Sequence, residues 1–177
     1  MLQFSESAEA QFQDIVGRYP NTLAALLPVL TLAQSEFGWI SVEVMDYVAE
    51  RLDLHPAKVL STATFYSMYF KSPPAKCNIQ VCTTLSCALC GGYEIMEHLE
   101  DVLGINVGEA TGDNIFSLEE VECLASCGSA PMFQVTFSDG EIEYYENLST
   151  KKVDGLLDEL RAQAERLPDP REMHGRD

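Results

Sequence analysis

Four cysteines in two short segments constrain this chain more than any other feature of its sequence. Cys82 and Cys87 lie in VCTTLSCALCGG, residues 81–92, and Cys123 and Cys127 lie in VECLASCGSAP, residues 121–131. Each pair follows a stretch with the alternation of a strand, and small residues surround both pairs. Four thiolates brought together by two loops form the arrangement that a metal centre needs.

The spacing within the pairs bears on which metal centre this is. Zinc knuckles usually use C-x2-C, which places two sulfurs on one tight turn at one metal ion. Here the gaps are the wider C-x4-C and C-x3-C. A [2Fe-2S] cluster takes two thiolates at each of two separate irons, which suits wider loops. The spacing therefore favours a [2Fe-2S] cluster and leaves a structural zinc open.

Two other interpretations of the first segment also remain open at this point. Cys87 and Cys90 form a CxxC, and a thiol just before a helix has a lowered pKa, as in redox dithiols. That interpretation leaves Cys82, Cys123 and Cys127 without a role. A plant-type ferredoxin motif would use Cys82, Cys87, Cys90 and one distant cysteine. It leaves one member of the second pair idle and needs an irregular loop around Cys90, where residues 91–103 have helical spacing.

Charge and composition exclude several classes of function. The 177 residues carry 28 acidic and 11 basic side chains, a net charge of −17, which argues against nucleic acid and anionic membranes as partners. No stretch approaches 18 apolar residues, so we expect no direct membrane insertion. The N-terminal residues lack the features of a signal peptide, so we expect a cytoplasmic protein. In a reducing compartment six cysteines indicate metal binding or catalysis rather than disulfides.

The first seventy residues predict four short helices. We expect them at about residues 5–19, 22–38, 42–54 and from His55-Pro56 to about Met68, with Ser5, Ser41 and Pro56 marking starts. The expected buried positions are Leu23, Leu26, Leu27, Leu30 and Ala33; Val44, Tyr47, Val48 and Leu52; and Val59, Leu60, Ala63, Tyr66 and Met68. Short helices with short links are typical of a small bundle.

The period changes to that of strands after the linker KSPPAK, residues 71–76. Strands are expected from Cys77, over residues 115–123, over 132–137 and, past a hairpin turn at residues 138–140, in EIEYYEN; helices are expected at residues 91–103 and after Ser149. The order β-α-β-β-β-α predicts an α+β chain. Its parts are an N-terminal four-helix bundle (residues 1–72), a thioredoxin-like α/β domain with a mixed sheet (73–167) and a polar, frayed tail (168–177).

Four stretches carry a resemblance to a known family: EFGWIS at 36–41, ATFYSMY at 63–69, IQVCTTLSC at 79–87 and VECLASCGSAP at 121–131. Over about residues 12–160 the chain resembles the thioredoxin-like [2Fe-2S] subunit of bacterial NADH:quinone oxidoreductase (complex I), the counterpart of the mitochondrial 24-kilodalton subunit. The resemblance implies an electron-transfer subunit with one [2Fe-2S] cluster, ligated by Cys82, Cys87, Cys123 and Cys127.

The same resemblance implies the surroundings of the chain. It predicts a partner subunit that binds the flavin (FMN) and NADH, together with other subunits of the cytoplasmic peripheral arm of a membrane-associated complex. The N-terminal helices are the expected docking surface. No glycine-rich dinucleotide fingerprint follows a strand in this chain, which agrees with NADH binding elsewhere. The negative charge is expected to lower the reduction potential of the cluster.

The chain departs from the family pattern at two positions. Ala125 stands where family members usually have glycine, so this position is strained if it requires a positive φ. Cys90 is an additional cysteine, and we interpret both Cys90 and Cys77 as small hydrophobic residues. Pro131 is a candidate for a cis peptide. The alternative functions are the related subunit of an NAD-linked hydrogenase or formate dehydrogenase, and a zinc-stabilised binding module.

Overall fold

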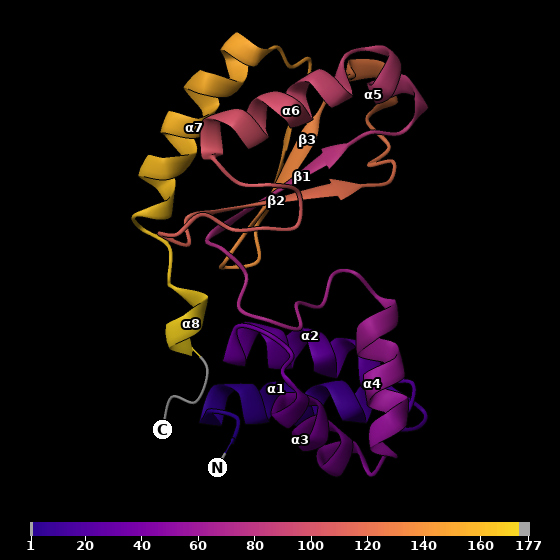
Figure 1. Cartoon of the computed structure of the whole chain (residues 1–177). Coiled ribbons are helices and arrows are strands. Elements are labelled where there is room, and N and C mark those ends of the chain that lie inside the picture. The colour runs from indigo at the N-terminus through magenta and orange to yellow at the C-terminus, as the bar shows by residue number, and fades with distance from the viewer. Residues whose placement is uncertain (1, 174–177) are drawn as a thin grey trace. The chain divides into compact units, whose positions relative to one another are not determined.

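The computed structural model describes residues 2–173 and divides into two compact units, each of which is described by itself. The described part of unit 1 comprises residues 2–73 and 170–173, and unit 2 comprises residues 74–169. Figure 1 shows the helices of unit 1 and the strands and helices of unit 2, with colour following the residue number. Residues 174–177 of the predicted tail lie outside the described residues.

Unit 1 contains the four predicted helices, α1 (Glu6–Arg18), α2 (Leu26–Phe37), α3 (Val42–Leu52) and α4 (Pro56–Phe65). The predicted caps form: the Ser5 hydroxyl accepts from the N–H of Ala8 at 3.2 Å, and the Ser41 hydroxyl accepts from that of Val44 at 3.2 Å. Pro56 occupies the start of α4, where its missing N–H leaves no helix bond unmade. Helical spacing and capping residues therefore predict these helices correctly.

The start of α2 and the end of α4 differ from the prediction. Some side chains that we expected to be buried are exposed. Residues 22–25 form turns and α2 begins at Leu26, so Leu23 is 48% exposed and Pro28 falls in the first turn, where proline is tolerated. The fourth helix ends at Phe65. The positions predicted to be buried that are instead exposed are Leu23, Leu27, Leu60, Tyr66 and Met68.

Arg51 joins two helices of unit 1 through one guanidinium group. Its nitrogens donate to both carboxylate oxygens of Glu9 at 2.7 and 2.8 Å and to the hydroxyl of Tyr47 at 2.8 Å. The guanidinium carbon also lies 4.2 Å from the ring centroid of Phe12. Because a two-pronged ion pair and a cation–π contact use the same group, Arg51 ties α1 to α3.

We expect the Arg51→Met variant to lose about 1–3 kcal/mol of unfolding free energy, because Met keeps the apolar stem but leaves Glu9 and Tyr47 without their partner. Fluorescence of Trp39, the single tryptophan, measured in a urea titration reports on unit 1. Arg18→Met is the matched control, because Arg18 pairs with Asp14 at an exposed site and should change stability by less than about 0.5 kcal/mol. Equal effects of the two substitutions would contradict this account of Arg51.

Unit 2 is a four-stranded mixed sheet with helices, as predicted. Its strands are β1 (Cys77–Cys82), β2 (Phe116–Val121), β3 (Phe133–Phe137) and β4 (Ile142–Tyr145), in the spatial order β2-β1-β3-β4. β1 pairs with β2 in parallel, whereas β1 with β3 and β3 with β4 are antiparallel. The expected order β-α-β-β-β-α is confirmed, with one further short helix, α5 (Leu85–Leu89), before α6 (Gly92–Leu103).

One face of the sheet forms the core of unit 2. Side chains of one parity, from Cys77, Ile79 and Val81 on β1 to Phe133, Val135 and Phe137 on β3, pack into a cluster with α6 and α7 (Thr150–Ala164). Figure 1 shows α6 and α7 crossing the same side of the sheet. The opposite face carries polar side chains, among which Gln80 donates to Glu119 at 2.9 Å. Cys82 has the opposite parity to Cys77, which places these two side chains on different faces.

The segment after Pro168 is not simply frayed, because Pro170–Met173 forms the short helix α8. This helix contacts α2 and belongs to unit 1. Its polar sequence gave no apolar periodicity from which it could have been predicted.

Candidate metal centre

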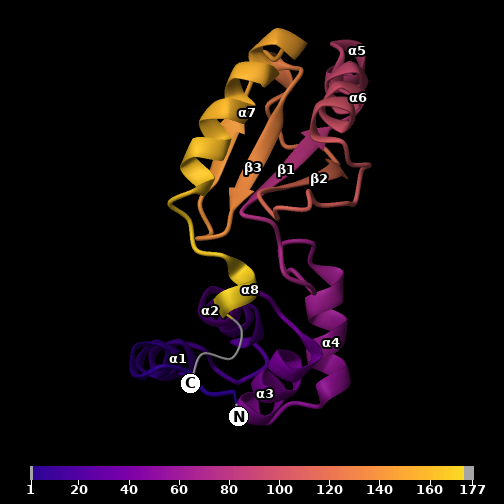
Figure 2. The same cartoon turned by 60° about the vertical axis from the view of Figure 1, so that its left-hand side comes forward.

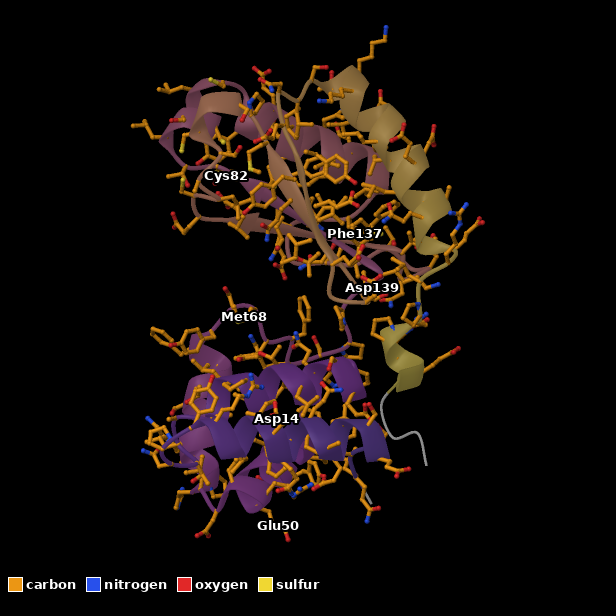
Figure 3. The ribbon with its side chains drawn as sticks, turned by 180° about the vertical axis from the view of Figure 1, so that it is seen from behind. Asp14, Glu50, Met68, Cys82, Phe137 and Asp139 are labelled. Atoms are coloured by element: carbon orange, nitrogen blue, oxygen red, sulfur yellow. The ribbon has the colours of Figure 1, made fainter. Side chains whose placement is uncertain are left out.

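The strand order brings both cysteine segments to one edge of the sheet. Because β1 and β2 are parallel, Cys82 at the end of β1 and Val121 at the end of β2 are register partners. Residues 83–91 leave this edge after β1, and residues 122–132 leave it after β2 and return to it at the start of β3. Figure 3 shows Cys82 at one end of the sheet with sulfur atoms gathered near it, and Asp139 at the other end.

The first pair, Cys82 and Cys87, is buried at this end of the sheet. Cys82 and Cys87 are both 2% exposed and pack with Met132, which is 1% exposed. Cys87 lies within α5, which is separated from the end of β1 by two residues and lies next to α6 in Figure 2. The prediction placed Cys87 in a loop before the longer helix, and the short helix α5 replaces that loop.

The second pair is exposed. The sulfurs of Cys123 and Cys127 lie 3.4 Å apart, with Cys127 opening the 3-10 turn η1 (Cys127–Ser129). The backbone N–H of Ala125 donates to the sulfur of Cys123 at 3.4 Å. Thus the four cysteines form two pairs with different burial, one covered by Met132 and one facing solvent.

Several contacts hold the two segments against each other. The N–H of Cys82 donates to the carbonyl of Met132 at 3.3 Å, and that of Thr83 donates to the carbonyl of Val121 at 3.5 Å. The backbone N–H of Leu124 donates to the sulfur of Cys82, and Cys127 contacts the hydroxyl of Ser86. Each cysteine pair therefore interacts with residues of the other segment.

The pKa values of the thiols show that they interact electrostatically. Burial raises the pKa of Cys87 to about 11, and the neighbouring thiolate of Cys82 adds to the rise. Burial would also raise the pKa of Cys82, but hydrogen bonds from Thr84 and from Leu124 outweigh it, so the pKa of Cys82 is lowered. Hydrogen bonding and charge from Cys123 raise the pKa of Cys127. Backbone and hydroxyl donors thus already favour a negative charge on sulfur at Cys82.

The donor set fits a [2Fe-2S] cluster in its chemistry. Thiolate sulfur is the ligand that such clusters use, two at each iron, and the four sulfurs here stand as two pairs. Among residues 2–173, no three Cys, His, Asp or Glu side chains are grouped closely enough to hold a single metal ion. N–H donors to the sulfurs of Cys82 and Cys123 suit a cluster of net negative charge.

Gly92 was not predicted to take part in this site. A Cβ at this position would lie 2.9 Å from the carbonyl oxygens of both Cys82 and Cys87. Cβ atoms in proteins essentially never lie this close to a backbone atom. The close approach lets the start of α6 pack directly on the first cysteine segment. In the sequence the Gly91-Gly92 pair is only a weak phosphate-binding signal, and its position directly after the cysteines is the available clue.

We expect Gly92→Ala to lower the unfolding free energy by about 1–3 kcal/mol, because a carbonyl-bearing backbone must move to make room for the methyl group. Thermal unfolding followed by far-UV circular dichroism measures the change. Gly155→Ala is the control, since Gly155 lies in α7 with nothing within 4 Å of the added Cβ. That variant should gain up to about 1 kcal/mol from the higher helix propensity of alanine. A neutral Gly92→Ala would show that the packing is loose.

Ala125 adopts the positive φ that the sequence marks as strained for alanine. Its φ is 64°, in the left-handed region, within the second cysteine segment. An L-residue with a Cβ costs about 1–2 kcal/mol more than glycine there. Glycine would adopt this backbone conformation without that cost, and the chain accommodates alanine here.

We expect Ala125→Gly to stabilise the protein by about 0.5–1 kcal/mol, the relief of strain being partly offset by the greater freedom of glycine in the unfolded chain. Chemical unfolding curves of the cluster-free protein give the difference directly. Ala162→Gly, at an exposed position in the last turn of α7, is the opposite case and should cost up to about 1 kcal/mol. Should both substitutions destabilise equally, the strain at Ala125 would be disproved.

The remaining sequence candidates are also placed. Cys77 is fully buried in the core of unit 2, as expected of a small hydrophobic residue, and burial raises its pKa to about 11. Cys90 caps the C-terminal end of α5 and its side chain is exposed, so it does not pack as the hydrophobic residue that we expected. The peptide bond from Ala130 to Pro131 is cis.

Fold and cysteine arrangement together define a thioredoxin-like protein with two cysteine pairs at one sheet edge. The family model of the thioredoxin-like [2Fe-2S] ferredoxin matches residues 12–161. The chain belongs to this family, which confirms the resemblance carried by the four sequence stretches.

Curated relatives cover most of the chain. It is 38% identical over 157 residues to the second E-type subunit of the NADH-quinone oxidoreductase of Rhizobium meliloti (strain 1021), covering 89% of this chain and 90% of the relative. It is 37% identical to NADH-quinone oxidoreductase subunit 2 of Thermus thermophilus (91% and 88% covered) and 40% identical to the E-type subunit of the NADH-quinone oxidoreductase of Rickettsia bellii (84% and 88% covered).

Among solved structures, the chain is similar to an NAD+-reducing [NiFe]-hydrogenase in the air-oxidized state, with a TM-score of 0.66 and 23% identity. The match covers 81% of this chain and 24% of the hydrogenase chain, and at this identity it shows the fold alone. Within residues 2–173, no helix is both long enough and apolar enough for a bilayer span.

Proposed function

We propose that Cys82, Cys87, Cys123 and Cys127 hold one [2Fe-2S] cluster, and that the chain carries electrons within NADH:quinone oxidoreductase. The observation that supports this most directly is the meeting of two cysteine pairs at one edge of the sheet. When bound, such a cluster supplies reversible one-electron chemistry. The chain's own residues then determine how the cluster is held and how exposed it is.

The protein groups around the sulfurs divide into those that stabilise charge and those that exclude water. The sulfur of Cys82 is approached by the N–H of Leu124 and the hydroxyl of Thr84, and the sulfur of Cys123 by the N–H of Ala125. These groups stabilise negative charge on the thiolates. Met132 covers Cys82 and Cys87 on the inner side. Because Cys123 and Cys127 are exposed, the second pair lies nearest to any partner that exchanges electrons with the site.

The relatives' names supply the proposed setting. All three relatives above are NADH-quinone oxidoreductase subunits, at 37–40% identity over most of the chain. NADH gives up two electrons together, so a flavin is needed to divide them into single-electron steps. We propose that the partner subunit binds FMN and NADH, and that this chain lies with other subunits in the cytoplasmic peripheral arm of the membrane-associated complex.

The four proposed ligands are tested by single substitutions. Cys123→Ser and Cys87→Ser should each lose most of the iron and acid-labile sulfide and the visible absorption that dithionite bleaches, because a serine oxygen is a poorer ligand for this cluster. The measurement is metal and sulfide analysis of protein purified without oxygen, together with absorption spectra.

Cys90→Ser is the matched control and should keep the cluster, although Cys90 lies only three residues from Cys87. Loss of the cluster in Cys90→Ser with retention in Cys123→Ser would disprove the proposed ligand set in favour of a plant-type arrangement. Colourless protein with one zinc per chain would support the zinc-stabilised binding module instead.

The same module in an NAD-linked hydrogenase or formate dehydrogenase is the second candidate setting, and the fold of the hydrogenase chain is compatible with it. The identities of the relatives favour NADH:quinone oxidoreductase. Mass spectrometry of the chains that co-purify with the tagged protein from native membranes and from the soluble fraction distinguishes the two.

A further inference from the structure

The segment that joins β4 to α7 lies alongside the second cysteine segment. The N–H of Asn147 donates to the carbonyl of Ser129 at 2.8 Å, and that of Leu148 donates to the carbonyl of Pro131 at 3.0 Å. Because β4 is antiparallel to β3, it ends at the same sheet edge as the cysteines. Residues 146–148 therefore form a backbone support for the segment that carries Cys123 and Cys127.

Glu146 adds a side-chain anchor to this support. Its Oε1 accepts a hydrogen bond from the hydroxyl of Ser129 at 2.8 Å and another from the hydroxyl of Ser126. The two hydroxyl oxygens lie 3.0 Å apart. Ser126 directly precedes Cys127 and Ser129 follows it by two residues, so one carboxylate oxygen holds the chain on both sides of a proposed ligand.

The charge of Glu146 is held close to the site by the same contacts. The side chain is half-buried, which weakens solvent screening of its charge. The ammonium group of Lys152 donates to the backbone carbonyl of Glu146 at 2.6 Å, not to its carboxylate. A half-buried carboxylate next to a centre that gains an electron on reduction makes that reduction less favourable.

Resting on the proposed function, we propose that Glu146 is a positioning residue for the cluster. It fixes the turn of Cys127 through Ser126 and Ser129, and its negative charge lowers the tendency of the site to accept an electron. The two roles are separable, because glutamine retains an oxygen that accepts the serine hydroxyls but carries no charge, whereas alanine removes both.

The anchoring role is tested on the full-length chain freed of iron, by hydrogen exchange read out by mass spectrometry. We expect Glu146→Ala to speed exchange of the amides of residues 124–129 by about fivefold or more, because the turn loses both side-chain hydrogen bonds. Glu146→Gln should stay within about twofold of the wild type. The control Glu141→Ala removes an exposed carboxylate two residues after Asp139, which Figure 3 shows at the opposite end of the sheet from Cys82. It should have no effect at residues 124–129.

The charge role is tested on the cluster-loaded chain by a redox titration followed by absorption and electron paramagnetic resonance. We expect Glu146→Gln to raise the equilibrium constant for one-electron reduction by about three- to tenfold, tenfold corresponding to 59 mV. Glu141→Gln removes the same formal charge at the far end of the sheet and should change that constant by less than about twofold.

The two experiments decide the anchoring role and the charge role of Glu146 separately. Unchanged exchange in Glu146→Ala overturns the anchor, and equal potentials in Glu146→Gln and Glu141→Gln overturn the charge role. Far-UV circular dichroism identifies a variant that has lost its fold; if Glu146→Ala does so, Ser129→Ala, which removes one of the two hydroxyl donors, carries the anchor test with the same expected direction. Absence of iron and sulfide from the wild type overturns the proposed function and the charge role with it, while the exchange experiment still decides the anchor.

Discussion

Parallel pairing of β1 with β2 is the constraint on which the candidate site depends. Their register, Cys77 with Phe116 through Cys82 with Val121, ends both strands at one edge, and each strand is followed by one cysteine pair. Antiparallel pairing of β1 with β3 then returns residues 122–132 to the same edge. The site is thus a consequence of strand direction, and the side chains of the core face hold that direction in place through α6 and α7.

The local geometry of the candidate site depends on close contacts of the backbone at Gly92 and Ala125 with the cysteine residues. Gly92 allows α6 to begin against the carbonyls of Cys82 and Cys87, and Ala125 takes up a left-handed conformation so that its N–H reaches the sulfur of Cys123. Hydrogen bonds to sulfur from backbone groups compensate for burial, which is why the pKa of Cys82 falls although burial alone would raise it. The support from residues 146–148 extends this principle to the exposed pair.

The helical unit is stabilised differently, by apolar packing and by the guanidinium of Arg51 between Glu9, Tyr47 and Phe12. Its helices were predictable because caps and apolar spacing act within a few residues of each other. The exposure of Leu23 and Met68 was not, because both residues lie outside the helices that form. The start of α2 is shifted by four residues and the end of α4 by three, which accounts for these two errors.

By itself the sequence determined the class of fold, the order β-α-β-β-β-α, the family and the four candidate sulfurs, since periodicity, caps and motif spacing are local properties. It also identified Ala125 as a position of interest. Only the tertiary structure decided which pair is buried, that Gly92 must lack a side chain, that Cys90 faces solvent and that Glu146 binds Ser126 and Ser129. The physical reason is that these features arise from contacts between residues 5 to 20 positions apart or more, whose meeting depends on strand pairing.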